Sequence, residues 1–199
     1  MEWLFSNIEA LLTQFGYLAL FAIVFAESGL FFGFFLPGDS LLFAAGLLAS
    51  QGVFDVWITF LVVFVAAVLG DQAGYWMGNK WGRSFFVRPN SWLFKPKRLL
   101  QAENFYKKHG KKTIVLARFV PAVRTFTPIF AGIVKMDYQT FIKYNVLGGF
   151  LWSAIFVGAG FYLGSVFPQI ENYFFLIIAA IIVFSVIPLA LEYMKNRKN

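Results

Sequence analysis

The chain has 199 residues, of which 59% are hydrophobic and 21% aromatic, while only 14% carry a charged side chain. A soluble globular domain is typically about 25% charged and about 45–50% apolar, so this composition excludes an ordinary soluble protein and indicates one integral membrane domain. The chain has no cysteine and one histidine, His109, which excludes disulfides and thiolate or multi-histidine metal sites. We expect neither a metal nor another cofactor.

The net charge of +7 is concentrated in two places. Ten of the 17 Lys and Arg residues lie between Lys80 and Lys112, beside one acid, and a second basic cluster occupies residues 195–198. The positive-inside rule places both clusters in the cytoplasm. Nucleic-acid binding would use the same residues, but apolar runs of membrane length bracket the central basic segment, so we expect no nucleic-acid partner.

Six apolar segments follow one another along the chain. They cover residues 11–26, 30–49, 56–77, 113–134, 141–163 and 173–191. A full span needs about 20 apolar residues, so the third, fifth and sixth segments predict ordinary spanning helices. The first is short, and it predicts a tilted or partly interfacial helix.

The second and fourth segments are interrupted by helix breakers. Pro37 and Gly38 precede Asp39 in the second segment, and Pro121 and Pro128 lie in the fourth. Proline removes a helix donor and clashes with the preceding turn. Non-helical backbone survives at membrane depth only inside protein or beside a wet cavity. We therefore predict two re-entrant hairpins broken at these residues, and two plain helices with proline kinks are the alternative.

The two halves of the chain resemble each other. A Gly-aromatic motif at 74–78 matches one at 160–164, which lies 86 positions later, and Gly46 and Gly132 share this offset. Matching interrupted segments in two halves are typical of a transporter binding site. When the membrane crossings are counted from the basic cytoplasmic loop, the two hairpins enter from opposite faces.

These observations predict an all-α polytopic membrane protein built as an inverted repeat, with two opposed hairpins and several spanning helices. The predicted parts are repeat 1 at about 11–82, a basic cytoplasmic linker at about 83–112, repeat 2 at about 113–165 and a C-terminal helix at about 173–192. The basic stretch between residues 95 and 112 also contains apolar residues, which predicts an amphipathic helix on the cytoplasmic headgroups. This helix either orients the protein or gathers anionic lipid.

Two arginines lie in the fourth apolar segment. Arg118 and Arg124 flank Pro121, so both side chains can turn toward one cavity. A guanidinium stays protonated and presents a planar fork of donors that fits phosphate oxygens. The broken helix also frees backbone N–H groups, which add anion affinity. We predict a phosphate-binding site, and the alternative is that the arginines snorkel or form structural ion pairs.

Three acids are the expected partners of these arginines. Glu27, Asp39 and Asp71 lie in apolar surroundings, where they can neutralise the arginines and exchange protons. Asp39 has the alternative role of capping the returning half-helix. Asp71 belongs to a ridge of small residues that predicts close helix packing. The glycines expected to pack in this way are Gly70, Gly74, Gly78, Gly160 and Gly164.

Together these elements resemble a known family. Glu27 and the runs at 35–39, 70–78 and 118–124 are similar to those of the DedA family, also called the SNARE-associated or VTT-domain family, over nearly the whole chain. The resemblance implies paired re-entrant loops, essential intramembrane acids and arginines, dependence on the proton-motive force and a bacterial inner-membrane location. Its acidic pair corresponds to Glu27 and Asp39, and its arginine pair to Arg118 and Arg124. Several members are implicated in returning undecaprenyl phosphate across the membrane, and eukaryotic relatives act as lipid scramblases.

We therefore expect a transporter rather than an enzyme. The predicted activity is translocation of a polyprenyl or phospholipid phosphate as a flippase or scramblase, linked to protons and supporting the cell envelope. Anionic lipid headgroups are further expected partners, and a homo-oligomer stays open.

The main alternative is a proton-coupled antiporter for cations or drugs, in which Asp39 and Glu27 bind the substrate and the arginines balance charge. A lipid phosphatase or transferase is disfavoured because the only histidine lies in a basic loop and the acids are spread over distinct segments. An assembly factor for other membrane proteins also stays open.

Overall fold

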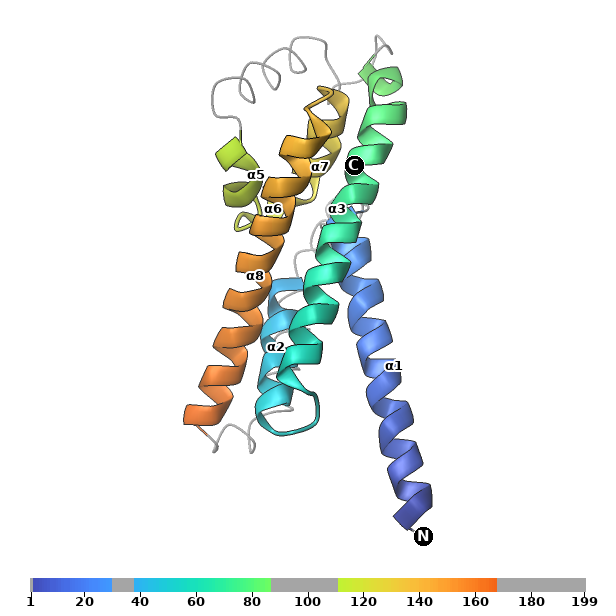
Figure 1. The fold of residues 1–199 in the computed structure, drawn as a ribbon, viewed down its shortest axis with the longest axis vertical. Helices are drawn as coiled ribbons and strands as arrows, with labels where there is room; N and C mark the ends of the chain where they lie inside the picture. The colour runs from blue at the N-terminus through green and yellow to red at the C-terminus, as the bar shows by residue number, and fades with distance from the viewer. Residues whose placement is uncertain (1, 30–37, 87–110, 168–199) are drawn as a thin grey trace, which may run out of the picture. The chain divides into compact units, whose positions relative to one another are not determined.

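The computed structural model describes residues 2–29, 38–86 and 111–167 (Figure 1). Every element within these ranges is an α-helix and none is a strand, which confirms the predicted all-α class. The helices are α1 (Glu2–Gly29), α2 (Gly38–Ser50), α3 (Val56–Phe86), α5 (Lys111–Ala117), α6 (Pro121–Arg124), α7 (Phe126–Ile133) and α8 (Tyr138–Val166). The predicted amphipathic segment at 95–110, the predicted C-terminal helix at 173–192 and Pro37 lie outside the described residues.

Two of these helices are long and apolar enough to cross a membrane. They are Val56–Trp81, with 26 residues, and Tyr138–Val166, with 29 residues. At 1.5 Å per residue they extend about 39 Å and about 43 Å, which exceeds the roughly 30 Å of a hydrocarbon core. The outer face of α3 is apolar as well, and Trp57 on it is 73% exposed. Both helices coincide with predicted spans, the third and the fifth apolar segments.

The fourth apolar segment is broken before Pro121, as predicted, whereas the predicted break at Pro128 is wrong because α7 continues through that residue. After α5 ends at Ala117, three successive N–H groups donate to the carbonyl three residues back, and Val120 is extended with φ −114° and ψ 104°. The residue before a proline avoids the helical region, and proline fits the first position of the next helix, so α6 starts at Pro121. Pro128 lies within the first turns of α7, where it leaves the Arg124 carbonyl without its usual helical donor. Helix α7 contacts α5, so the chain doubles back.

The helices form two compact units, and each is described here by itself. Within the described ranges, the first comprises residues 2–23, 38–63 and 153–167, and the second comprises 24–29, 64–86 and 111–152. In the first unit α2 packs along the C-terminal part of α8 (Figure 1), and a Cβ added at Gly46 would come within 3.0 Å of the Val157 carbonyl oxygen. A Cβ at Gly160 would come equally close to the Phe43 carbonyl. Only glycine permits this approach of two helix backbones.

The second unit repeats the same interlock with different residues. A Cβ at Gly132 of α7 would overlap the Tyr75 carbonyl of α3, and a Cβ at Gly78 would overlap the Ile129 carbonyl. In both units the paired helices run parallel, because residue numbers rise together along the contact. Gly132 thus corresponds to Gly46, as the sequence offset of 86 predicts. The residue that corresponds to Gly160 is Gly78, which is one turn beyond the predicted Gly74.

The starts of the spanning helices show why the offset changes. Asp55 accepts hydrogen bonds from the Trp57 and Ile58 N–H groups at 2.8 and 2.9 Å, and Asp137, 82 positions after Asp55, accepts one from Thr140 at 2.8 Å. Four more residues therefore lie between glycine and helix cap in the first half than in the second. Three of these four residues lengthen α2. The chain after α2 reaches a left-handed residue at Gly52, with φ 79°, six residues after Gly46.

The equivalent left-handed residue after α7 is Lys135, with φ 51°, and it comes only three residues after Gly132. Since four residues make about one helical turn, the change of offset moves every later residue by one turn while keeping it on the same helix face.

Candidate functional site

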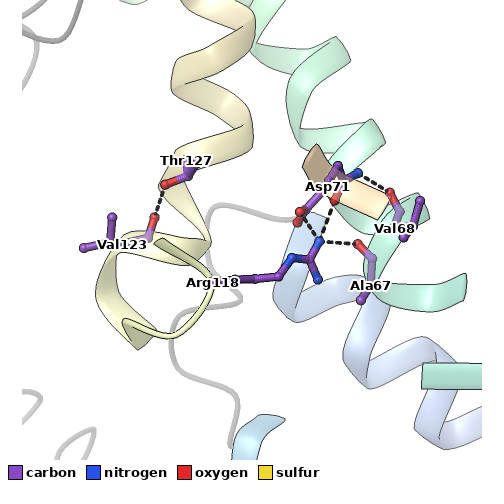
Figure 2. A network of polar contacts seen from close by, with 7 residues as sticks. Ala67, Val68, Asp71, Arg118, Val123 and Thr127 are labelled. Atoms are coloured by element: carbon purple, nitrogen blue, oxygen red, sulfur yellow. Dashed lines mark hydrogen bonds and ion pairs between the residues drawn. The ribbon is translucent and has the colours of Figure 1, made fainter. Parts of the chain in front are cut away.

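Arg118 lies in the second unit, at the break that follows α5. Its side chain is buried, and its Nη2 contacts the Asp71 carboxylate of α3. Figure 2 shows the guanidinium reaching α3, where it also approaches the Ala67 carbonyl at 3.5 Å. The break at Pro121 makes this possible, because it turns the chain out of helical geometry beside the arginine.

Asn145 of α8 completes this network. Its Oδ1 accepts a hydrogen bond from Arg118 Nη2 at 2.6 Å, and its Nδ2 donates one to the Val68 carbonyl at 3.1 Å. Asn145 is fully buried and thus links α8, α3 and the broken segment. The sequence analysis missed it, although a lone amide within an apolar span is itself a signal of a specific polar contact.

Arg124 forms the second ion pair of the site. At the end of α6 its Nη2 contacts the carboxylate of Glu27 near the end of α1, and both side chains are more than 90% buried. The guanidinium carbon of Arg124 lies 5.0 Å from the ring centre of Trp152, and that of Arg118 lies 5.9 Å from it. Trp152 therefore contributes a cation–π contact to both arginines, a role that the sequence analysis also missed.

The glycine ridge brings Glu27 to this position. A Cβ at Gly70 would lie 2.7 Å from the Phe25 carbonyl oxygen, and a Cβ at Gly29 would lie 2.6 Å from the Gly70 carbonyl oxygen. The end of α1 and the middle of α3 thus touch backbone to backbone. One turn along, Gly74 packs against Pro128 of α7. The ridge packs as its spacing predicts, and it places α1 and α7 beside the helix that carries Asp71.

One turn further along α3, an aromatic core fixes this helix against α8. The Tyr75 ring stacks on the Phe141 ring with centroids 4.5 Å apart, and the Tyr75 hydroxyl donates to the Met136 carbonyl at 2.5 Å. Ile114 and Ala131 belong to the same buried cluster. The broken segment is therefore anchored on both sides of its break.

Both arginines and Asp71 line one narrow crevice, and its other walls are Ser28 and Trp152. Each arginine is closed onto its carboxylate. Two buried polar atoms of the ion pairs nevertheless lack a hydrogen-bond partner among the described residues, Glu27 Oε2 and Arg118 Nε.

Two further predicted site residues, Asp39 and Gly38, belong to the first unit, where both lie in the first turn of α2. An acid in the first turn complements the positive end of the helix dipole. Gly164 lies on α8 in the same unit, and a Cβ there would meet Ser50.

The geometry limits the chemistry that the crevice can perform. Two guanidiniums and two carboxylates balance in charge, so the closed site has no net attraction for an ion. An anion can bind only if it replaces a carboxylate as the partner of an arginine. Conversely, a carboxylate that loses its arginine would be a buried, uncompensated charge, and such a group usually takes up a proton.

Comparison with known proteins agrees with this architecture. The VTT domain model matches residues 36–162. Protein DedA of Escherichia coli K12 is 42% identical over 197 residues, which cover 96% of this chain and 90% of that protein. An uncharacterized membrane protein of Mycobacterium tuberculosis is 45% identical over 168 residues, 83% of this chain and 73% of the relative.

Inner membrane protein YqjA of Escherichia coli K12 is 36% identical over 160 residues, 78% of this chain and 72% of that protein. No solved structure matches. The long apolar helices, the glycine interlocks and these similarities together assign the chain to the DedA family of VTT-domain membrane proteins.

Proposed function

We propose that this protein is a proton-linked translocase of lipid phosphates that returns undecaprenyl phosphate across the bacterial inner membrane. One observation carries the proposal: two buried arginines of a broken helix, each closed onto its own carboxylate, share a single crevice. Guanidiniums in such a place are expensive, and they are retained where an anion must be handled. The choice of undecaprenyl phosphate over other lipid phosphates comes from the family resemblance.

Binding proceeds by exchange of partners. A phosphate monoester offers several acceptor oxygens and more negative charge than one carboxylate, so it competes for Arg118 and Arg124. Each carboxylate released in this way is buried without a counter-ion, which costs about 3–5 kcal/mol. Protonation of Asp71 and Glu27 removes that cost. Loading of phosphate is thereby tied to uptake of protons, and proton loss closes the ion pairs again after the phosphate leaves.

The lipid tail needs no site of its own. The outer faces of α3 and α8 are apolar, with Leu61, Val65 and Ile155 among the exposed side chains. An isoprenoid chain can stay against such faces in the bilayer while the phosphate alone enters the crevice. In this arrangement the central basic loop and the C-terminus face the cytoplasm, and the two hairpins enter from opposite sides.

The proposal is tested with proteoliposomes that contain undecaprenyl phosphate and report its amount in each leaflet. We expect the protein to equilibrate the lipid between the leaflets and Arg124→Ala to abolish this. Lys143→Ala, which removes an exposed cation from α8, is the matched control and should retain the full rate. Wild-type rates in Arg124→Ala would refute the phosphate role.

Replacing arginine by lysine separates the proposal from the antiporter alternative. Lysine keeps the charge but lacks the planar fork. A phosphate site should therefore lose most of its activity in Arg124→Lys, whereas arginines that only balance charge should tolerate the change. An enzyme that hydrolyses lipid phosphate would instead release inorganic phosphate, which the same liposomes reveal.

A further inference from the structure

The repeated interlock defines which residues face each other in each unit. In the first unit positions 43, 46 and 50 of α2 face positions 157, 160 and 164 of α8. Extending each stripe by one helical turn adds position 39 on α2 and position 153 on α8. Both stripes have the 4-3-4 spacing of a single helix face. One turn before the glycine contact, this register sets Asp39 opposite Ser153.

The second unit has the same register with the residue types exchanged. Here positions 129 and 132 of α7 face positions 75 and 78 of α3. Thr125 has helical angles, φ −67° and ψ −31°, so it continues the stripe of α7. The register sets Thr125 opposite Asp71. Each unit thus carries one acid and one hydroxyl at the equivalent level, with the acid on the hairpin helix in one unit and on the spanning helix in the other.

An independent observation singles out the same two hydroxyls. Thr125 and Ser153 are at most 1% exposed, and their hydroxyl oxygens have no hydrogen-bond partner within the described ranges. A helical serine or threonine can usually donate to a carbonyl of the preceding turn. Thr127 does so to Val123 at 2.8 Å (Figure 2), and Ser165 does so to Phe161 at 2.8 Å. The hydroxyls of Thr125 and Ser153, each opposite an acid in the register, therefore make no such bond to their own helix.

We propose that Thr125 is the reserve hydrogen-bond partner of Asp71 and that Ser153 is that of Asp39, so that each carboxyl has a hydroxyl to bond when it is protonated. This inference rests on the proton-linked exchange proposed above. In the closed state the Asp71 carboxylate is paired with Arg118, and the Thr125 hydroxyl has no hydrogen-bond partner among the described residues. Once the arginine leaves for phosphate, the protonated carboxyl and the hydroxyl bond to each other. The hydroxyl thus favours the open, loaded state only.

Other charged and titratable groups also face Asp71, and the test must separate them. Arg118 contacts Asp71 directly, Arg124 lines the same crevice, and Glu27 is the partner of Arg124. Tyr75 lies one turn along α3, with its hydroxyl bonded to the Met136 carbonyl. Because Glu27 is a second carboxylic acid beside these groups, the assay requires a background in which Asp71 cannot titrate.

The readout is the fluorescence of Trp152, whose ring lies under both guanidiniums. It is recorded as a function of pH in detergent, as the difference between each variant and the same variant with Trp152→Phe. We expect Thr125→Val, which keeps the shape and removes the hydroxyl, to lower the pH at which the ion pair opens by about 0.5–1 unit, the worth of one hydrogen bond. Thr125→Ser should leave the midpoint in place.

Thr127→Val is the matched control, because that hydroxyl is already bonded to its own helix. It should not shift the midpoint, and neither should Thr125→Val in an Asp71→Asn background. An unchanged midpoint in Thr125→Val, or an equal shift in the Asp71→Asn background, would overturn the proposal. Thr125→Ala replaces Thr125→Val if the latter does not fold.

The pair in the first unit is tested by cross-linking, which the absence of native cysteine makes clean. Asp39→Cys with Ser153→Cys should be joined by Hg²⁺, so that the fragments stay together after trypsin cuts the basic segment between them. Ser40→Cys with Ser153→Cys points away by about 100° and should not be joined. The reverse result would contradict the register.

Neither assay uses a lipid substrate, so the two proposals can fail separately. A Thr125→Val shift in a protein that moves no undecaprenyl phosphate would refute the transport function and leave the hydroxyl role standing. Transport of undecaprenyl phosphate without a Thr125→Val shift would support the transport function and refute the hydroxyl role.

Discussion

Two glycines of α8 that lie two positions apart provide a sharp test of the interlock. Among the described residues, nothing lies within 4 Å of a Cβ added at Gly158. A Cβ at Gly160 would press on the Phe43 carbonyl and on the Leu47 N–H group, both of which are backbone and cannot rotate away. Gly158→Ala should raise the free energy of unfolding by about 0.5–1 kcal/mol through helix propensity alone. Gly160→Ala gains the same propensity but forces α2 and α8 apart, at a cost of about 1–3 kcal/mol.

The free energies of unfolding of these two variants should therefore differ by about 1–3 kcal/mol. The effect of alanine on helix propensity is the same in both variants, so it drops out of this difference. Thermal unfolding in detergent, followed by loss of the monodisperse peak in size-exclusion chromatography, measures it as a lower midpoint for Gly160→Ala than for Gly158→Ala. Gly78→Ala should behave like Gly160→Ala, since it meets the Ile129 backbone in the same way. Equal midpoints for Gly158→Ala and Gly160→Ala would refute the backbone contact.

Three further predictions concern the ion pairs and the topology. Asn145→Leu deprives the buried guanidinium of Arg118 of its acceptor at 2.6 Å and should destabilise the protein by about 1.5–3 kcal/mol in the same assay; unchanged stability would exclude Asn145 as a partner. Glu27→Gln keeps the shape but leaves a buried cation without its counter-ion, which should cost about 3–5 kcal/mol, and a loss below 1 kcal/mol would mean that the pair is solvated. For topology, Val53→Cys, which is 50% exposed, should react with a membrane-impermeant maleimide added to spheroplasts, whereas Gln139→Cys should react only in opened membranes; labelling of both from one side would contradict opposed hairpins.

Local features of the sequence were enough to predict the helices and the main break. Hydropathy predicts the two long helices, because a span is a matter of length and apolar content. Pro121 predicts the interruption between α5 and α6, since its ring acts on the residue directly before it. The helix that ends at Gly29 is longer than the apolar run at 11–26, because a helix can extend beyond its apolar part into polar sequence.

Which acid pairs with which arginine could not be predicted in this way. Arg124 contacts Glu27, which is 97 positions away, and Arg118 contacts Asp71, which is 47 positions away. No periodic pattern encodes such a choice, because it depends on how α1 and the broken segment dock on α3. Asn145 escaped notice for a related reason: its helix is apolar overall, and only the three-dimensional contact shows what the amide serves.

The internal repeat shows a different limit of sequence comparison. The glycines at 46 and 132 align at 86 positions, but the helix caps Asp55 and Asp137 align at 82. A single offset carried through both halves therefore matches Gly160 with Gly74 instead of Gly78. The two offsets differ by four residues, which is about one helical turn. Matching Gly160 with Gly74 therefore still aligns glycine with glycine, and the sequence alone does not reveal the mismatch.

The unsatisfied atoms favour a working ion-pair network over a purely structural one. A pair kept only for stability would satisfy every buried donor and acceptor, since each orphan costs about 1–3 kcal/mol. Here Arg118 Nε and Glu27 Oε2 have no partner among the described residues, although both arginines are closed onto carboxylates. A phosphate between the arginines would give the Arg118 Nε–H group an acceptor. A proton on the released Glu27 carboxyl would turn its unpaired oxygen into a hydrogen-bond donor. The closed state thus leaves one donor and one acceptor of the site without a partner among the described residues, as the proposed exchange of partners predicts.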